Sequence, residues 1–284
     1  MSRILVFGEI LYDLFEEKAE IGGAPFSFAA HCALLGDEAD LVSAVGRDAM
    51  GYMADKELRK KGVGSDYVAK TDLPTGYCKV TLDGVKPTYE LMNGVAYDHI
   101  PRPEIKGEYD ALYFGTLAQR SGISQNTLKE LLKRDYREIL LDVNVRAPFC
   151  TRELLEDSLR AATLVKITRE EAFVVMPYPA SDEEYCETLL NRFPGLKQVI
   201  LTFGKDGSMV MDRERGVFRS STPPSVPVST VGAGDAFGAC YLHHRLKGSD
   251  IPRCIEAATL LSDYVVTQLG AVPSVPKELM EKIV

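Results

Sequence analysis

Short apolar runs alternate with amphipathic segments along most of the chain, and this alternation restricts the fold more than any other feature. The apolar runs have the composition of strands: 4–7, 41–45, 111–114, 139–143, 164–167 and 199–202. The remaining segments have helical periodicity: 25–35, 50–61, 124–132, 153–162, 169–176, 182–191, 235–247 and 252–268. Strands that alternate with helices indicate an α/β fold, in which a mostly parallel sheet is covered by helices on both faces.

Two stretches interrupt this rhythm. Residues 9–21 and 75–92 alternate polar and apolar side chains, and Asp83-Gly84 has the composition of a tight turn. Strands with one polar face and no neighbouring helix suit a small antiparallel flap that covers a ligand cleft and excludes water from it. We therefore expect one domain over residues 1–284, with a β-lid formed from about 9–21 and 75–100.

Composition excludes several classes of protein. The formal net charge is −8 and the Lys and Arg residues are dispersed, which argues against binding to nucleic acid. The six cysteines have no paired spacing, so neither a disulfide framework nor a zinc site is expected. No signal peptide and no apolar run of membrane-spanning length is present, so we expect a cytoplasmic protein without membrane contact.

The segment Gly232–Asp235 is the strongest candidate for chemistry. Glycines before a predicted helix let backbone amides converge on one point, and the helix N-terminus favours negative charge there. Such a loop suits a transferring phosphoryl group, and Asp235 could accept a proton from an attacking hydroxyl. Two other interpretations remain open here: Asp235 could be a helix cap, or Gly232, Gly234 and Gly238 could belong to a dinucleotide-binding fold.

Polar residues elsewhere are candidates for ligand binding. Asp13 could accept hydrogen bonds from a polyol, and the paired glycines Gly22 and Gly23 permit a close approach. Asp142, Asn144 and Arg146 alternate at the end of a predicted buried strand, where ligands bind in open α/β sheets. Arg146 could clamp a carboxylate or phosphate, and its neighbours could hold substrate hydroxyls or metal-bound water.

The later motifs have simpler explanations beside the functional ones. Thr168 and Glu171 have the spacing of a capping box, although a Glu at a cleft could also hold water on magnesium. Residues 202–207 have the composition of a β-hairpin turn, and they could also form part of a nucleotide-binding surface. His243 and His244 lie on a predicted helix as surface or packing residues, and no His spacing predicts a metal site.

In this order the motifs resemble the ribokinase-like (PfkB) carbohydrate kinases over nearly the whole chain. The matching motifs are Gly22-Gly-Ala-Pro25, Asp142-x-Asn-x-Arg146, Thr202-x-Gly-x-x-Gly207 and Gly232-Ala-Gly-Asp235. Within that family, the segments 8–13, 96–100 and 114–119 are most similar to bacterial fructokinases. The resemblance implies a three-layer α/β/α ribokinase-like fold with a small β-strand lid.

The resemblance also implies an activity and its residues. The γ-phosphate of ATP, held with Mg²⁺, would pass to a sugar hydroxyl, with fructose as the leading candidate for the sugar. Asp235 would be the catalytic base, and the amides of Gly232, Ala233 and Gly234 the anion hole. The implied substrate contacts are Asp13, Gly22, Gly23, Ser27, Gln119, Asn144 and Arg146. The implied nucleotide contacts are Thr168, Thr202, Gly204 and Gly207, with Glu171 acting on magnesium through water.

Departures from the family pattern keep other functions open. Ser27 and Thr168 stand where Asn is usual, and Ser229 stands where an Asp helps to hold a monovalent cation in many relatives. A sensor that binds a sugar or nucleotide without catalysis is therefore one alternative. The others are 2-keto-3-deoxygluconate kinase, because Arg146 could clamp a carboxylate, and a Rossmann oxidoreductase. An edge of the lid could also pair with a second copy to form a homodimer.

Overall fold

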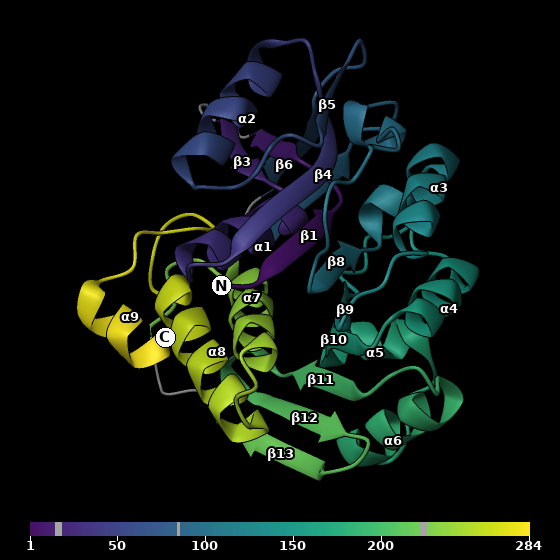
Figure 1. Ribbon diagram of the computed structural model, residues 1–284, viewed down its shortest axis with the longest axis vertical. Helices are drawn as coiled ribbons and strands as arrows, with labels where there is room; N and C mark the ends of the chain where they lie inside the picture. Colours follow the sequence, from purple (N-terminus) through teal and green to yellow (C-terminus); the bar gives the residue numbers. More distant parts are fainter. Residues whose placement is uncertain (15–18, 84–85, 222–225) are drawn as a thin grey trace.

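The chain is described by a computed structural model that covers residues 1–14, 19–83, 86–221 and 226–284. The main sheet in these residues consists of β1 Arg3–Phe7, β4 Glu38–Gly46, β5 Val68–Thr71, β8 Ala111–Gly115, β9 Glu138–Asp142, β10 Leu164–Thr168, β11 Gln198–Thr202, β12 Ser208–Asp212 and β13 Gly216–Ser220. Their order across the sheet is β13-β12-β11-β10-β9-β8-β1-β4-β5 (Figure 1). In this order, each pair of adjacent strands from β11 through to β5 is parallel. The strands β12 and β13 add an antiparallel hairpin at the β11 edge. The predicted mostly parallel sheet is confirmed.

Helices cover both faces of this sheet, as predicted (Figure 1). One face carries α1 Ala24–Leu34, α2 Ala49–Lys60, α7 Ala233–Leu246, α8 Ile251–Val266 and α9 Lys277–Ile283. The other face carries α3 Gly122–Leu131, α4 Arg152–Ala161, α5 Arg169–Val175 and α6 Asp182–Arg192. Apolar side chains between the sheet and each helical layer form separate cores, so the arrangement is the predicted three-layer α/β/α fold.

The helix ends follow from local sequence. Asp48 begins α2 by accepting a hydrogen bond from the Gly51 amide at 2.7 Å. Gly62 follows α2 with φ 73°, and Gly248 follows α7 with φ 81°. Glycine adopts this left-handed conformation without a steric penalty, so both helices end here. Their ends lie within one residue of those predicted from the sequence, 61 and 247.

A second, four-stranded sheet has the order β3-β2-β6-β7. Its strands are β2 Leu11–Leu14, β3 Ala19–Gly22, β6 Gly76–Asp83 and β7 Lys86–Leu91. The hairpins β2-β3 and β6-β7 are antiparallel, but β2 and β6 pair in parallel, so the prediction of a wholly antiparallel flap is wrong. The reason is geometric: β2 and β6 closely follow β1 and β5, which point the same way in the main sheet, so both leave its edge in one direction.

Parts of the predicted flap, including Gly84 of the turn and residues 15–18, lie outside the described residues, as do residues 222–225. The limits of the lid at about 9–21 and 75–100 therefore stay a prediction. The elements β5, β13 and α9 are absent from the sequence-based prediction. In the described part of the chain, no helix combines the length and the apolar character needed to cross a bilayer.

The histidine pair on α7 is buried rather than on the surface. His243 Nδ1 lies 2.6 Å from Asp37 Oδ2, and His244 Nε2 lies 2.7 Å from the Ile283 carbonyl oxygen. Both residues thus pack the helix against neighbouring elements. The six cysteines are free, as predicted.

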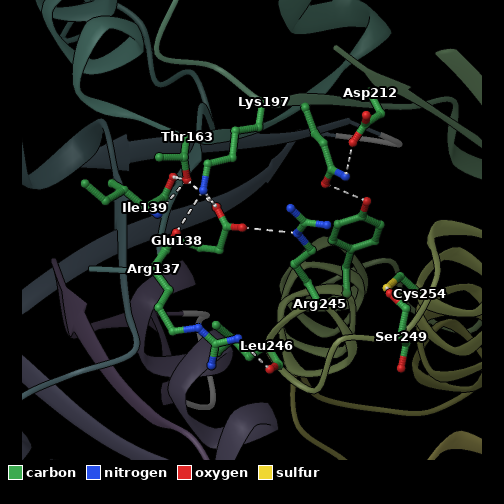
Figure 2. A network of polar contacts seen from close by, with 12 residues as sticks. Arg137, Glu138, Ile139, Thr163, Lys197, Asp212, Arg245, Leu246, Ser249 and Cys254 are labelled. Carbon is green, nitrogen blue, oxygen red and sulfur yellow. Dashed lines mark hydrogen bonds and ion pairs between the residues drawn. The ribbon is translucent and has the colours of Figure 1, made fainter. Parts of the chain in front are cut away.

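A polar network joins the strands at their amino-terminal edge (Figure 2). Glu138, at the start of β9, accepts hydrogen bonds from Thr163 Oγ1 at 2.7 Å, Lys197 Nζ at 3.0 Å and Arg245 Nε at 3.1 Å. Glu138 is thus a fully paired buried carboxylate at the opposite end of its strand from Asp142.

Candidate active site

The carboxyl ends of the parallel strands meet at one edge of the sheet. The strand register places Gly115 beside Asp142, Asp142 beside Lys166, and Thr168 beside Thr202. The N-termini of α1 and α7 reach the same edge, and a cavity of about 390 Å³ lies between them and the second sheet. In open α/β sheets this is the position where ligands bind.

The cavity brings together most of the residues predicted from the sequence. Those that line it are Asp13, Gly22, Gly23, Ser27, Asn144, Arg146, Thr168, Glu171, Gly232, Gly234 and Asp235. These residues come from five separate segments of the chain, so their convergence could not have been read from any one motif.

The Gly232–Asp235 loop forms the start of α7. Gly232 is the residue before the helix, with φ 83°, and a Cβ there would lie 2.3 Å from the Ala271 carbonyl oxygen. Among the described residues no side chain caps α7, so Asp235 does not serve as its cap. The amides of the first turn have no partner further back in the helix, and they favour an anion at this point.

Lys166 is a functional candidate that the sequence analysis missed. It lies on β10, is 4% exposed, and its Nζ lies 2.8 Å from each carboxylate oxygen of Asp142. A Cβ on Gly234 would lie 3.2 Å from the same Nζ, so the lysine also approaches the loop of α7. Burial lowers the pKa of Lys166, but Asp142, with smaller contributions from Asp235 and Glu171, raises it, and the net shift is upward.

The electrostatic surroundings of Asp235 suit a proton acceptor. Burial, and next the nearby Asp142 carboxylate, raise its pKa from 3.8 to about 8, while Lys166 and Arg146 oppose this shift. Asp235 is half-buried and lines the cavity. A carboxylate with a pKa near neutrality can take a proton from a reacting group and hold it.

The opposite wall of the cavity carries two further carboxyl groups. Asp13 projects from β2, where a Cβ on Gly22 would lie 3.1 Å from its Oδ2. Glu9, which the sequence analysis did not single out as a site residue, is 3% exposed and also lines the cavity. Burial raises the pKa of Asp13, and it raises that of Glu9 from 4.5 to about 7.

The segment after β9 contributes Asn144 and Arg146. Asn144 has φ 39°, a left-handed conformation that is uncommon outside glycine and often marks a functional site. Arg146 is exposed, lines the cavity, and lowers the pKa of Glu9, Asp13 and Asp235.

The capping box at the start of α5 is confirmed. Thr168 Oγ1 accepts from the Glu171 amide at 3.2 Å, and Glu171 Oε2 accepts from the Thr168 amide at 2.9 Å. Glu171 Oε1 accepts from the Val145 amide at 2.8 Å. Each carboxylate oxygen thus holds one backbone amide and keeps further lone pairs for water, so the predicted magnesium role stays a prediction.

Other predicted residues do not line the cavity. The Gln119 amide nitrogen is buried and donates to the Gly115 carbonyl oxygen at 2.8 Å and to Ser158 Oγ at 3.1 Å. The Ala233 amide donates to the Thr230 carbonyl oxygen at 3.4 Å. Thr202, Gly204 and Gly207 form the β11-β12 hairpin beside Thr168. Their roles toward substrate or nucleotide remain predictions.

The described residues hold no group of three or more His, Cys, Asp or Glu side chains placed to bind a metal ion. Magnesium in phosphate-transferring enzymes is commonly held by one or two carboxylates together with waters and substrate phosphates. Glu171 and the loop of α7 are compatible with that mode.

Comparison with known proteins defines the class to which this chain belongs. The chain is 25% identical over 297 residues to an ATP-dependent 6-phosphofructokinase of Thermoanaerobacterium thermosaccharolyticum, covering 96% of this chain and 90% of that protein. Its fold superposes with a TM-score of 0.84 on an uncharacterized sugar kinase from Pyrococcus horikoshii in complex with ATP, at 25% identity over 99% of this chain and 100% of the other. The fructokinase from Vibrio cholerae O395, bound to fructose, ADP and calcium, gives a TM-score of 0.84 at 22% identity, covering 99% and 98%.

These similarities are those of ATP-dependent phosphotransferases with an alcohol group as acceptor. Residues 1–278 match the pfkB family carbohydrate kinases, and the chain belongs to that family. It is therefore an ATP-dependent sugar kinase of ribokinase-like fold. The Rossmann oxidoreductase considered for the glycine loop is excluded by this membership, and the loop also begins well after β13 rather than directly at a strand end.

Proposed function

We propose that the chain transfers the γ-phosphate of Mg-ATP to a hydroxyl of a small neutral sugar, with fructose as the leading candidate. One observation carries the proposal: Asp235, at the start of α7, and Asp13, on the second sheet, line the same cavity. Asp13 would hold sugar hydroxyls, and Asp235 would take the proton of the attacking hydroxyl.

The residues around Asp235 fit the charge of a phosphoryl group. The first-turn amides of α7 and the Lys166 ammonium group provide positive potential, and Gly232 and Gly234 leave room beside them. Bound Mg-ATP would supply the phosphoryl group. The task of the chain is then to align the hydroxyl, to neutralise charge and to exclude water beneath the second sheet.

Fructose is favoured over other sugars by the segments 8–13, 96–100 and 114–119, which resemble bacterial fructokinases. The second candidate is 2-keto-3-deoxygluconate, because Arg146 lines the cavity and could bind a carboxylate. Fructose 6-phosphate is a third, through the phosphofructokinase relative. A cytoplasmic location, and a homodimer through the edge strand β3 or β7, remain predictions.

The test is release of ADP by the wild-type protein with a panel of acceptors. Fructose, ribose, 2-keto-3-deoxygluconate, fructose 6-phosphate and nucleosides are compared at equal concentration with Mg-ATP. We expect the highest kcat/KM with fructose. Tight binding of a sugar by calorimetry, with no ADP formed from any acceptor, would instead support a non-catalytic sensor.

A further inference from the structure

Glu9 occupies an unusual position for a carboxyl group. It lies two residues after the end of β1 and lines the cavity, yet it is only 3% exposed. The start of α1 packs against it, because a Cβ on Gly23 would lie 2.5 Å from the Glu9 carbonyl oxygen. The backbone of Glu9 is therefore held tightly where the two sheets and α1 meet.

The Glu9 side chain lacks the partners that a buried carboxyl group normally has. Its Oε2 is buried and has no hydrogen-bond partner among the described residues, and the backbone hydrogen bond that lowers the pKa of the carboxyl group comes from Glu9 itself. Arg120 is a buried cation that lowers the pKa of Glu9, but its Nε and Nη2 are paired with Asp98 at 2.6 and 3.0 Å, and its Nη1 has no partner among the described residues. Nearly all buried polar atoms in native structures have a partner, either protein or ordered water. Because Glu9 also lines the cavity, its Oε2 is placed to gain that partner from a bound ligand or its water.

The charges around Glu9 indicate what that ligand is. Lys166 is paired with Asp142, and the charge of Arg146 lowers the pKa of both Glu9 and Asp13, which line the same cavity. Two carboxyl groups and one arginine therefore line this part of the cavity, a balance that favours a neutral ligand over an anion. Sugar hydroxyls can both donate to a carboxylate and accept from a protonated carboxyl group, so they suit Glu9 in either state.

We propose that Glu9 is a substrate-contacting specificity residue, whose Oε2 hydrogen-bonds a hydroxyl of a neutral sugar. Together with Asp13 it disfavours sugar acids and sugar phosphates by repulsion and by the cost of an unpaired buried group. This inference rests on the proposed sugar-kinase function and adds the residue that selects a neutral sugar over a charged one.

Two variants and one control test the proposal. Glu9→Gln removes the charge, and Glu9→Leu removes the polar atoms while keeping an apolar side chain of similar reach. Glu138→Gln is the matched control, since Glu138 is a buried carboxylate at the opposite edge of the sheet, where all its contacts are structural (Figure 2). The Kd of the preferred sugar is measured by calorimetry, KM and kcat by ADP release, and stability by thermal unfolding.

We expect Glu9→Leu to raise the Kd and KM for the sugar at least ~10-fold, the usual cost of losing a good hydrogen bond to a buried group. The KM for ATP should change less than about twofold, and Tm should not fall, because no completed hydrogen-bond network is lost. Glu138→Gln should lower Tm and leave the KM for the sugar unchanged.

Acceptor analogues sharpen the test. One monodeoxy sugar lacks the hydroxyl that Glu9 contacts, and for that sugar Glu9→Leu should leave Kd and KM unchanged. Glu9→Gln should lower the ratio of kcat/KM for fructose to kcat/KM for fructose 6-phosphate. A wild-type Kd for the sugar in both Glu9 variants would overturn the inference while leaving the kinase function intact. A wild-type protein that binds and phosphorylates no neutral sugar would overturn the proposed function itself, and the inference with it.

Discussion

Replacing Lys166 by Met removes the buried cation between Asp142 and the loop of α7. In the wild-type protein its Nζ lies 2.8 Å from both Asp142 oxygens, and the side chains are 6% and 4% exposed. Removing one partner of a buried pair leaves an uncompensated charge, which typically costs about 3–5 kcal/mol. We expect the free energy of unfolding in urea to fall by about that amount, and the double variant Lys166→Met/Asp142→Asn to regain most of it.

The single variants Lys166→Met and Asp142→Asn should shift the pH dependence of catalysis in opposite directions. Lys166 lowers the pKa of Asp235, whereas Asp142 raises it. The acid limb of the kcat/KM profile should therefore shift to higher pH in Lys166→Met and to lower pH in Asp142→Asn. ADP release across a range of buffers measures both profiles.

Lys197→Met is the matched control, because Lys197 pairs with Glu138 at 3.0 Å at the opposite edge of the sheet (Figure 2). Lys197 is partly exposed, so its loss should cost less stability and should not move the pH profile. The reasoning would be refuted if Lys166→Met unfolded at the same urea midpoint as the wild-type protein. It would also be refuted if the kcat/KM profiles of Lys166→Met and Asp142→Asn shifted in the same direction along the pH axis.

Other outcomes follow from the same geometry. Burial raises the pKa of Glu9 from 4.5 to about 7, so between these values the folded state holds a proton that the unfolded state has lost. The free energy of unfolding should then fall as pH rises, by up to about 1.4 kcal/mol per pH unit, and urea titrations of Glu9→Gln should show a shallower dependence. Gly23→Ala forces φ 101° on alanine with its Cβ 2.5 Å from a carbonyl oxygen, so unfolding should show a loss of at least ~1 kcal/mol. Because Ser229 carries no carboxylate, exchanging K⁺ for a bulky organic cation should change turnover by less than about twofold.

The alternation of strands and helices was predictable because each element has a strong local signal. Buried parallel strands are continuously apolar, and Gly62 and Gly248 stop helices where only glycine adopts the backbone angle without strain. The parallel pairing of β2 with β6 was not predictable in this way, since it depends on contacts between segments far apart in the chain.

The site was predictable where a motif gathers several polar residues, as at Gly232–Asp235, and not where one residue acts alone. Lys166 stands singly within the apolar strand β10. A lysine in a buried strand requires a partner, and Asp142 on the next strand was the available signal. Glu9 gave a weaker signal, because its lack of a partner is visible only once the protein is folded.

The most direct test of the account is transfer of the ATP γ-phosphate to a sugar hydroxyl by the wild-type protein and by Asp235→Asn. Phosphorus NMR follows the sugar phosphate formed, and calorimetry gives the Kd for Mg-ATP. We predict that kcat falls by about 10²–10⁴-fold in the variant, the range for loss of a general base, while the Kd for Mg-ATP stays within about twofold. Wild-type turnover by Asp235→Asn would contradict the assignment of the base.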